Sequence, residues 1–348
     1  MNRRAMLAAL LGGTFLAAGG RARAAAPRRV IVLDWGLAEL TLAIGVVPVG
    51  MANTPGFRRN FTACPVPDSV VDLGLMFQPN MELMLALKPD LIVITPAHAP
   101  MRGALERIAP TVTLGMFRAS ATPYTAACEE TMRLAHLYGC APQGEAAVAR
   151  SRRAVAQARA RLDALPAHAA TIYLARFVDE SHLRVFGAHS LFGELLAQLG
   201  LRNAWGGANG AAVAMTGFDA LDADPRATLV YVKPLPALTA AMMQTSRIWQ
   251  AMPFARAGRM TGMAEVPPEG GILSAAYFAG ALVDALSKLS ADGEPAQGVA
   301  RPGRLAGNAS AGNASAGNAS AGNASAGNAW ARNASPPTER SPQTAEAA

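Results

Sequence analysis

The sequence is poor in cysteine, with three in 348 residues: Cys64, Cys128 and Cys140. Three cysteines in a chain of this length exclude a disulfide framework as the basis of the fold. Cys128 and Cys140 are about one helix length apart, which disfavours a bond between them. We expect buried thiols that pack as small apolar groups, and a bridge to Cys64 is the alternative in an oxidising compartment.

The sequence also lacks the short motifs of catalytic and nucleotide-binding sites. It has no GxGxxG after the first expected strand, and no GxxxxGK[ST], HExxH, CxxC or GxSxG. Its five histidines show no metal-ligand spacing. We therefore predict that the protein is not an enzyme. An exported enzyme with a site built from scattered residues is the alternative, because such a site leaves no local motif.

The charge balance gives no indication of a nucleic-acid partner. The chain has 31 basic and 24 acidic residues, a net charge of +7. Four arginines lie in the first 24 residues, and without them the net charge is +3, spread along the chain. This is too mild for nucleic-acid binding. After the N-terminal region no run of 18 uninterrupted apolar residues occurs, so we predict no membrane span.

The N-terminus resembles an export signal. Arg3 and Arg4 precede the short apolar run "AMLAALLGGTFLAAGG", and "ARA" at 22–24 supplies a small-x-small cleavage site. We expect residues 1–24 to be removed and the rest to be free in the periplasm. The paired arginines favour a twin-arginine signal, and a Sec signal is the alternative.

The C-terminal part, residues 291–348, has a different composition. From Ala306 the motif "AGNAS" occurs four times, followed by "AGNAW", "ARNAS" and a segment rich in Pro, Ser and Thr. Segments with so little apolar surface do not offset the entropy of ordering. We expect a disordered tail with no chemistry of its own.

The central residues alternate between strand-like and helix-like segments. "RRVIVLD" (28–34), "VVPVGMA" (46–52) and "LIVIT" (91–95) are β-branched apolar runs, and "WGLAELTLAIG" (35–45) has helical spacing. This alternation predicts an α/β fold. The pattern resumes beyond residue 170, with expected strands at 171–177, 183–187 and 228–233 and helices at 190–200 and 270–289.

One segment separates the two α/β regions. Residues 142–165, rich in Ala and Arg, predict a single mostly polar helix of about 22 residues. We therefore expect an N-terminal α/β lobe at 25–141, a connecting helix at 142–165 and a C-terminal α/β lobe at 166–290.

The methionine-rich run "LGLMFQPNMELML" (73–85) needs two explanations. Asn80 is a suitable helix cap, and Leu83, Met84 and Leu87 form an apolar stripe expected to face a sheet. Met76 and Phe77 precede the cap, where no periodicity requires large apolar groups. A ligand-contacting lip and core packing are the alternatives for these two residues.

Several phrases occur in the order of a known family: "RRVIVLDWGLAELTLAIGVVPVGMANT", "PDSVVDLGL", "PNMELMLALKPD", "RIAP", "LRVFGAHSLFGELLAQLGLRNAW" and "IWQAMPFARAGR". Together they resemble the periplasmic ferric hydroxamate-siderophore binding proteins of bacterial ABC importers, over residues 28 to 289. The resemblance implies two α/β lobes on one long helix, with a ligand cleft between the lobes. It also implies a monomer that delivers a ferric siderophore to an inner-membrane permease. Iron would be held only through the chelate, with no cofactor or protein metal ligand.

The expected pocket departs from the family pattern. Met76 stands where close relatives carry an arginine, and His98 stands where they carry a tyrosine. Asn60, Ile94, Ala211 and 267–269 stand where cleft aromatics are found. An atypical iron chelate is the expected ligand, and haem or a cobalamin-like corrinoid is the alternative on the same scaffold.

The resemblance also gives two sets of candidate residues. The first set is expected to contact the ligand: Trp35, Phe57, Arg58, Met76, Phe77, His98, Met215 and Glu269. Packing is the alternative for Trp35, and a solvated position is the alternative for Arg58. Glu82 and Asp219 match the acidic positions that dock to the permease, with solvated helix-end carboxylates as the alternative.

Overall fold

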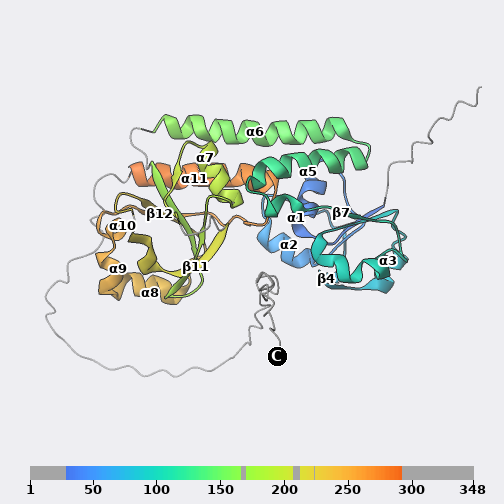
Figure 1. Ribbon diagram of the computed structural model, residues 1–348, viewed down its shortest axis with the longest axis horizontal. Helices are drawn as coiled ribbons and strands as arrows, with labels where there is room; N and C mark the ends of the chain where they lie inside the picture. Colours follow the sequence, from blue (N-terminus) through green and yellow to red (C-terminus); the bar gives the residue numbers. More distant parts are fainter. Residues whose placement is uncertain (1–28, 166–169, 207–211, 223, 292–348) are drawn as a thin grey trace, which may run out of the picture. The chain divides into compact units, whose positions relative to one another are not determined.

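The computed structural model describes residues 29–165, 170–206, 212–222 and 224–291 (Figure 1). The expected signal at 1–24 and nearly all of the expected tail at 291–348 lie outside these residues. The described residues form two large sheets with helices packed on them, as the predicted α/β class requires, and one two-stranded hairpin.

The first sheet is parallel throughout, in the order β3-β2-β1-β6-β7. The central strands β1 and β6 are wholly buried, which is why their sequences read as continuous apolar runs. The run at 46–52 was expected to be one strand, but only Gly50–Met51 pairs with β1. The strands are β1 (Val30–Val32), β2 (Gly50–Met51), β3 (Val71–Asp72), β6 (Leu91–Ile94) and β7 (Thr111–Thr113).

Short polar side chains begin the helices around this sheet. Asp34, Asn53 and Asn80 each accept a hydrogen bond from the backbone N–H three residues on, and so cap α1, α2 and α3. The helices are α1 (Trp35–Ala43), α2 (Thr54–Asn60), α3 (Met81–Ala86), α4 (Arg102–Leu105) and α5 (Pro123–Leu137), with 3-10 turns η1 (Pro96–Met101) and η2 (Met116–Ala119).

A small antiparallel hairpin lies beside this sheet. It pairs β4 (Gly74–Leu75) with β5 (Gln78–Pro79), so that Met76 and Phe77 form a two-residue tip. Asn80 then caps α3 directly after the hairpin. The capped helix and its buried Met84 confirm the core interpretation of 80–87, and they set Met76 and Phe77 apart from that helix.

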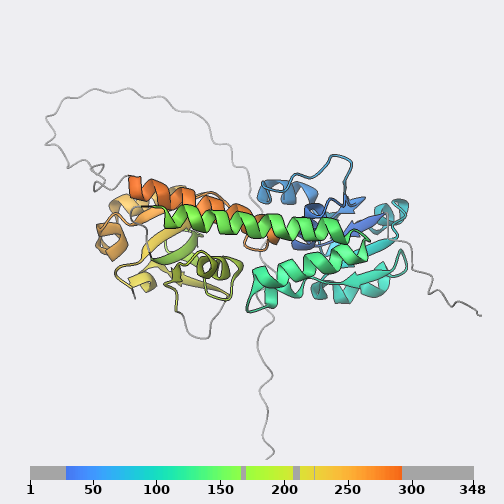
Figure 2. The same cartoon turned by 90° about the horizontal axis from the view of Figure 1, so that it is seen from above.

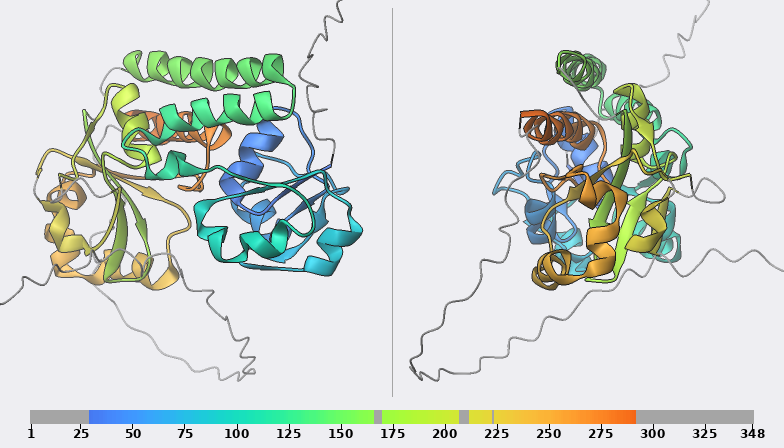
Figure 3. Two further views of the ribbon diagram at one scale, coloured as in Figure 1. Left: turned by 45° about the vertical axis from the view of Figure 1, so that its right-hand side comes forward. Right: turned by 90° about the vertical axis from the view of Figure 1, so that its left-hand side faces the viewer.

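The predicted long helix is α6 (Ala141–Asp163), 23 residues and about 35 Å long. It packs against α5 and α11, and these two helices lie between α6 and the sheets (Figures 2 and 3). Val148, Val155 and Leu162 recur at seven-residue intervals on its buried face. One hydrophobic cluster includes side chains of all three helices.

The second sheet is mixed, in the order β11-β9-β8-β12-β13. Strands β8, β12 and β13 are parallel, whereas β9 and β11 are antiparallel to their neighbours. Strand β10 pairs with the first half of β8. The strands are β8 (Thr171–Phe177), β9 (His182–Phe186), β10 (Arg202–Asn203), β11 (Val213–Gly217), β12 (Thr228–Val232) and β13 (Met260–Met263).

The two helices predicted for this half, at 190–200 and 270–289, are α7 and α11, and three further short helices were not predicted. Ser190 caps α7 by accepting from the Gly193 N–H at 2.9 Å, and Gly200 ends that region with φ +79°. The elements are η4 (Phe218–Asp222), α7 (Leu191–Gln198), α8 (Ala237–Thr245), α9 (Arg247–Ala251), α10 (Pro253–Arg256) and α11 (Ile272–Ala291).

Helix α11 is unusually apolar along most of its length. Of the described residues, only its window Ile272–Leu289 has the length and composition to cross a membrane, and 56% of that window is buried inside the protein. Core helices of globular proteins have the same composition. Its packing on α6 and on the second sheet identifies it as such a helix.

Two buried glutamates join the halves reciprocally. Glu39 on α1 accepts from the N–H groups of Gly271, Leu273 and Ser274 and from the Ser274 hydroxyl, at 2.7–2.9 Å, at the start of α11. Glu194 on α7 accepts from the N–H groups of Tyr124 and Thr125 at the start of α5. Each carboxylate therefore satisfies orphan donors of a helix in the other half.

Candidate functional site

The first sheet has a topological switch point between β1 and β6. From β1 the chain passes to β2 on one side, and from β6 it passes to β7 on the other. In open parallel sheets ligands bind outside the carboxyl ends of the strands at such a point. Asp34 follows β1 and Thr95 follows β6, so both lie at this edge.

An ion pair lies at the switch point. The Arg118 guanidinium donates to Asp34 Oδ2 at 2.8 Å, while Oδ1 of the same carboxylate accepts the Leu37 N–H and caps α1. Asp34 is buried and Arg118 is half-buried. The Gly115 N–H donates to the buried Glu130 carboxylate, which fixes the start of η2 on α5. Arg118 is thus a positioned cation at the sheet edge.

His98 lies in η1 beside this pair, and its side chain is almost wholly buried. Nδ1 accepts from the Thr95 N–H at 3.2 Å and lies 2.8 Å from the Thr95 hydroxyl. Burial lowers the pKa of His98, and the Asp34 carboxylate opposes that shift only in part. The ring is therefore neutral at pH 7.

The tautomer of His98 follows from its neighbours. Because Nδ1 accepts from a backbone N–H, the ring proton is on Nε2. Nε2 has no hydrogen-bond partner within 3.5 Å among the described residues. The nearby backbone of Met76 raises the pKa of His98, but by less than burial lowers it. The neutral imidazole thus presents an N–H donor, and direct metal ligation through Nε2 would require loss of that proton.

The hairpin tip covers His98. Phe77 is 51% exposed, and its ring centroid lies 5.0 Å from that of His98. Met76 is half-buried and packs on the cluster around Ile92 and Met84. Of the two residues, Phe77 presents apolar surface to solvent and Met76 supports it from the core.

The structure corrects the expectation for Phe57, which has no exposed surface. It stacks on Phe61 with centroids 4.4 Å apart, and Trp35 meets both rings edge-on. The Trp35 indole donates to the Ala52 carbonyl at 3.1 Å. Phe57 is a core residue, and Trp35 packs against it with a partly exposed side chain.

Arg58 lies on α2, and its side chain is hydrogen-bonded to a nearby loop. Its guanidinium donates to Asp68 Oδ1 at 3.1 Å and to the carbonyls of Val66 and Pro67 at 3.4 Å. It therefore does not join Asp34, His98 and Phe77. Arg118, which the sequence analysis did not single out, supplies the cation there.

The other candidate residues belong to other surfaces. Met215 on β11 is 56% exposed, and Glu269 is half-buried in the loop before α11. Glu82 on the first turn of α3 and Asp219 in η4 are both exposed, as a docking surface requires. The alternative interpretation, that they are solvated carboxylates at helix ends, predicts the same exposure.

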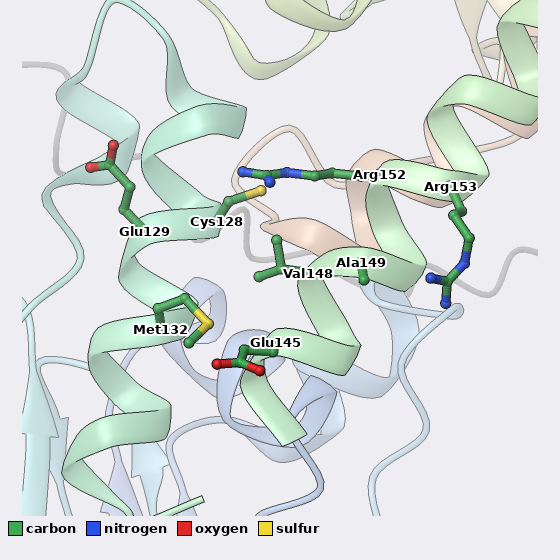
Figure 4. Close-up of a pocket in the computed structure, with 8 residues that line it drawn as sticks. All are labelled: Cys128, Glu129, Met132, Glu145, Val148, Ala149, Arg152 and Arg153. Atoms are coloured by element: carbon green, nitrogen blue, oxygen red, sulfur yellow. The ribbon is translucent and has the colours of Figure 1, made fainter. Parts of the chain in front are cut away.

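A groove between α5 and α6 has a volume of about 560 Å³ (Figure 4). Cys128, Met132 and Val148 contribute its apolar lining, with Glu145 and Arg152 among its charged residues. Burial raises the pKa of the Cys128 thiol, so it is not a reactive thiolate. No candidate ligand residue and no strand end lies on this groove.

Within the described ranges the three cysteines are free, and no group of three metal-ligating side chains occurs.

Two α/β lobes on one long connecting helix, with polar groups gathered at a switch point, define a class of solute-binding proteins. The sequence model of the periplasmic binding protein family matches residues 30–266, and the chain belongs to this family.

Two relatives of the chain are named for the iron chelates that they bind. The chain is 33% identical over 298 residues to the iron(3+)-hydroxamate-binding protein FhuD of Escherichia coli K12, covering 82% of this chain and 97% of the relative. It is 36% identical over 92 residues to the Fe(3+) dicitrate-binding periplasmic protein FecB of the same organism, covering 25% and 30%.

A solved structure shows the same architecture. The Fe3+-Desferal-bound siderophore-binding protein FhuD of Vibrio cholerae superposes with a TM-score of 0.69 at 28% identity, covering 75% of this chain and 98% of that one. The predicted family and the two-lobed fold with a connecting helix are therefore confirmed.

Proposed function

We propose that this protein captures a ferric siderophore in the periplasm and delivers it to an ABC importer of the inner membrane. The observation that carries the proposal is the likeness to the E. coli iron(3+)-hydroxamate-binding protein over 97% of that protein's length. The family match over residues 30–266 includes both sheets, the connecting helix and the loops at the switch point.

Iron enters this proposal as cargo. Fe(III) is a hard cation that prefers the hydroxamate or carboxylate oxygens of its chelator. The protein then needs to recognise the outer surface of the chelate and requires no cofactor. Export through the N-terminal signal and action as a monomer belong to the same proposal.

The recognition groups at the switch point are His98, Phe77 and Arg118. The Nε2–H of the neutral His98 is a donor for a chelate oxygen once the hairpin tip moves aside. Phe77 supplies exposed apolar surface, and Arg118 supplies positive charge. Together they replace the arginine and the tyrosine that the family pattern has at Met76 and His98.

Glu82 and Asp219 are the proposed permease contacts. Each is an exposed carboxylate in the first turn of a short helix, one in each half of the chain. This proposal is tested by measuring ferric siderophore import in cells that depend on this transporter. We expect Glu82→Ala to reduce import without changing chelate affinity.

Thermal unfolding of the purified chain tests the binding function. Ferrichrome-type and linear ferric hydroxamates, a ferric catecholate, ferric citrate, haem and cobalamin would each be added. A ligand at 100 times its dissociation constant stabilises a protein by about 2.7 kcal/mol. We expect stabilisation by a ferric chelate. Stabilisation by haem or cobalamin alone would mean that this compound, and not a ferric siderophore, is the ligand. Turnover of an added substrate would favour the alternative that the protein is an enzyme.

A further inference from the structure

Two arginines face each other directly across the second sheet. Arg176 on β8 and Arg184 on β9 are register partners in the antiparallel pair. Their Cβ atoms are therefore about 5 Å apart on one face of the sheet. Like charges in this position destabilise a sheet. A second function is the simplest reason for the sequence to keep both.

Only one of the two charges is neutralised. Arg176 donates to Glu265 Oε1 at 2.6 Å, and each side chain of this pair is about one-third exposed. Arg184 is half-buried, and its guanidinium makes no ion pair or hydrogen bond within the described ranges. Glu265 thus fixes Arg176 in place, and the pair retains one uncompensated positive charge.

The sheet around the pair favours a binding face over a solvated edge. Side chains alternate along a strand, so Ile172 and Leu174 on β8 and Phe186 on β9 share the face of the two arginines, and all three are buried. Met215 is opposite Arg184 on β11 and exposes 56% of its surface. The cations therefore lie on a partly apolar surface, where their interaction with an anion is stronger than in water.

The pair is also at the functional edge of its sheet. Arg176 is near the carboxyl end of β8, which runs parallel to β12 and β13, and ligands bind at this end of such strands. The loop after β13 contains Glu265 and ends at Gly271, whose N–H donates to Glu39 on α1 at 2.9 Å. Asp34, the N-cap of α1, lies in the switch-point site.

We propose that Arg176 and Arg184 form an anion-binding element, and that the ligand is a ferric chelate with a free carboxylate, such as a citrate-based hydroxamate. Guanidinium groups bind carboxylates through paired charge-assisted hydrogen bonds. A neutral ferric trihydroxamate offers them no charge. This inference rests on the proposed function and specifies the chemical class of its ligand.

Calorimetric titration of the purified chain tests the proposal with two probes, a ferric citrate-dihydroxamate and neutral ferrichrome. We expect Arg184→Gln to weaken binding of the first by about tenfold or more, with a loss that shrinks as salt rises. Binding of ferrichrome should change less than about twofold. Arg153→Gln on α6 removes the same charge from an exposed surface and should change neither affinity.

The outcomes separate this proposal from the function on which it rests. Equal losses for both probes, or no loss for either, would overturn the anion-binding element. Wild-type binding of ferrichrome but not of the carboxylate chelate would leave the transport function intact and overturn this inference. Failure to bind any ferric chelate would overturn both. The unliganded Arg184→Gln variant should melt at an equal or slightly higher temperature than the wild type, which distinguishes lost binding from misfolding.

Discussion

The ring of Phe77 lies over the imidazole of His98, with centroids 5.0 Å apart and planes inclined by 32°. The Phe77 ring is at an exposed hairpin tip, and the His98 ring is buried in the 3-10 turn η1 that follows β6. This contact isolates a neutral N–H donor from water. It also makes the accessibility of that donor depend on a two-residue turn.

Phe77→Ala should raise the pKa of His98 towards the ordinary value of 6.5, because burial is the main cause of its depression. An NMR titration of the His98 ring protons measures the shift. Leu85→Ala removes an equally exposed apolar side chain from α3 and is the control, with no expected effect on His98. An unchanged His98 pKa in the Phe77 variant would show that the ring does not shield it.

His98 should also affect the pH dependence of stability. Because its pKa is lowered by folding, the unfolded chain binds more protons below pH 6.5, and the free energy of unfolding should fall as the pH drops through that value. His98→Gln should reduce this slope between pH 7 and pH 5 in urea unfolding. An identical slope in the variant would contradict burial of a neutral ring.

Glu39→Ala should destabilise the chain by about 2–4 kcal/mol at pH 5, because it leaves buried N–H donors at the start of α11 unpaired. Burial raises the pKa of Glu39, so the stability that it contributes is greatest at low pH and declines as the pH rises through its folded pKa. Urea unfolding at several pH values measures both effects. Glu129→Ala, an exposed carboxylate on α5, should cost less than about 0.5 kcal/mol.

Asp34 and Arg118 should be energetically coupled. Asp34→Asn keeps an N-cap for α1 and removes the charge, and Arg118→Gln removes the opposite charge. A double-mutant cycle should give a coupling free energy of about 1 kcal/mol that declines with added salt. A coupling of zero at low salt would mean that Arg118 is not positioned by Asp34.

Local patterns in the sequence predicted most of the fold. Asn80 and Ser190 cap their helices as expected, because capping depends on a few adjacent residues. The long helix α6 begins and ends within two residues of its predicted bounds. Strand 46–52 was predicted too long, since only Gly50–Met51 finds partners in the sheet.

The site was less predictable because its contacts are long-range. The sequence singled out Phe77 and His98, but their contact depends on the hairpin turn and on η1. Arg118 reaches Asp34 across 84 positions, and the pairing of Arg176 with Arg184 depends on strand register. Phe57 was expected to form part of the cleft wall, whereas it is buried and stacks on Phe61. The one local feature that could have indicated the arginine pair is an arginine within a strand of otherwise apolar pattern, such as Arg184.

The central claim is that this chain binds an iron chelate, and a fluorescence titration tests it most directly. The purified chain would be titrated with a ferric hydroxamate bearing a carboxylate and, separately, with its iron-free form, following tryptophan emission. We expect saturable quenching at micromolar or lower concentrations by the ferric form and weaker binding of the iron-free form. Absence of saturable binding by this and by every other ferric chelate would contradict it.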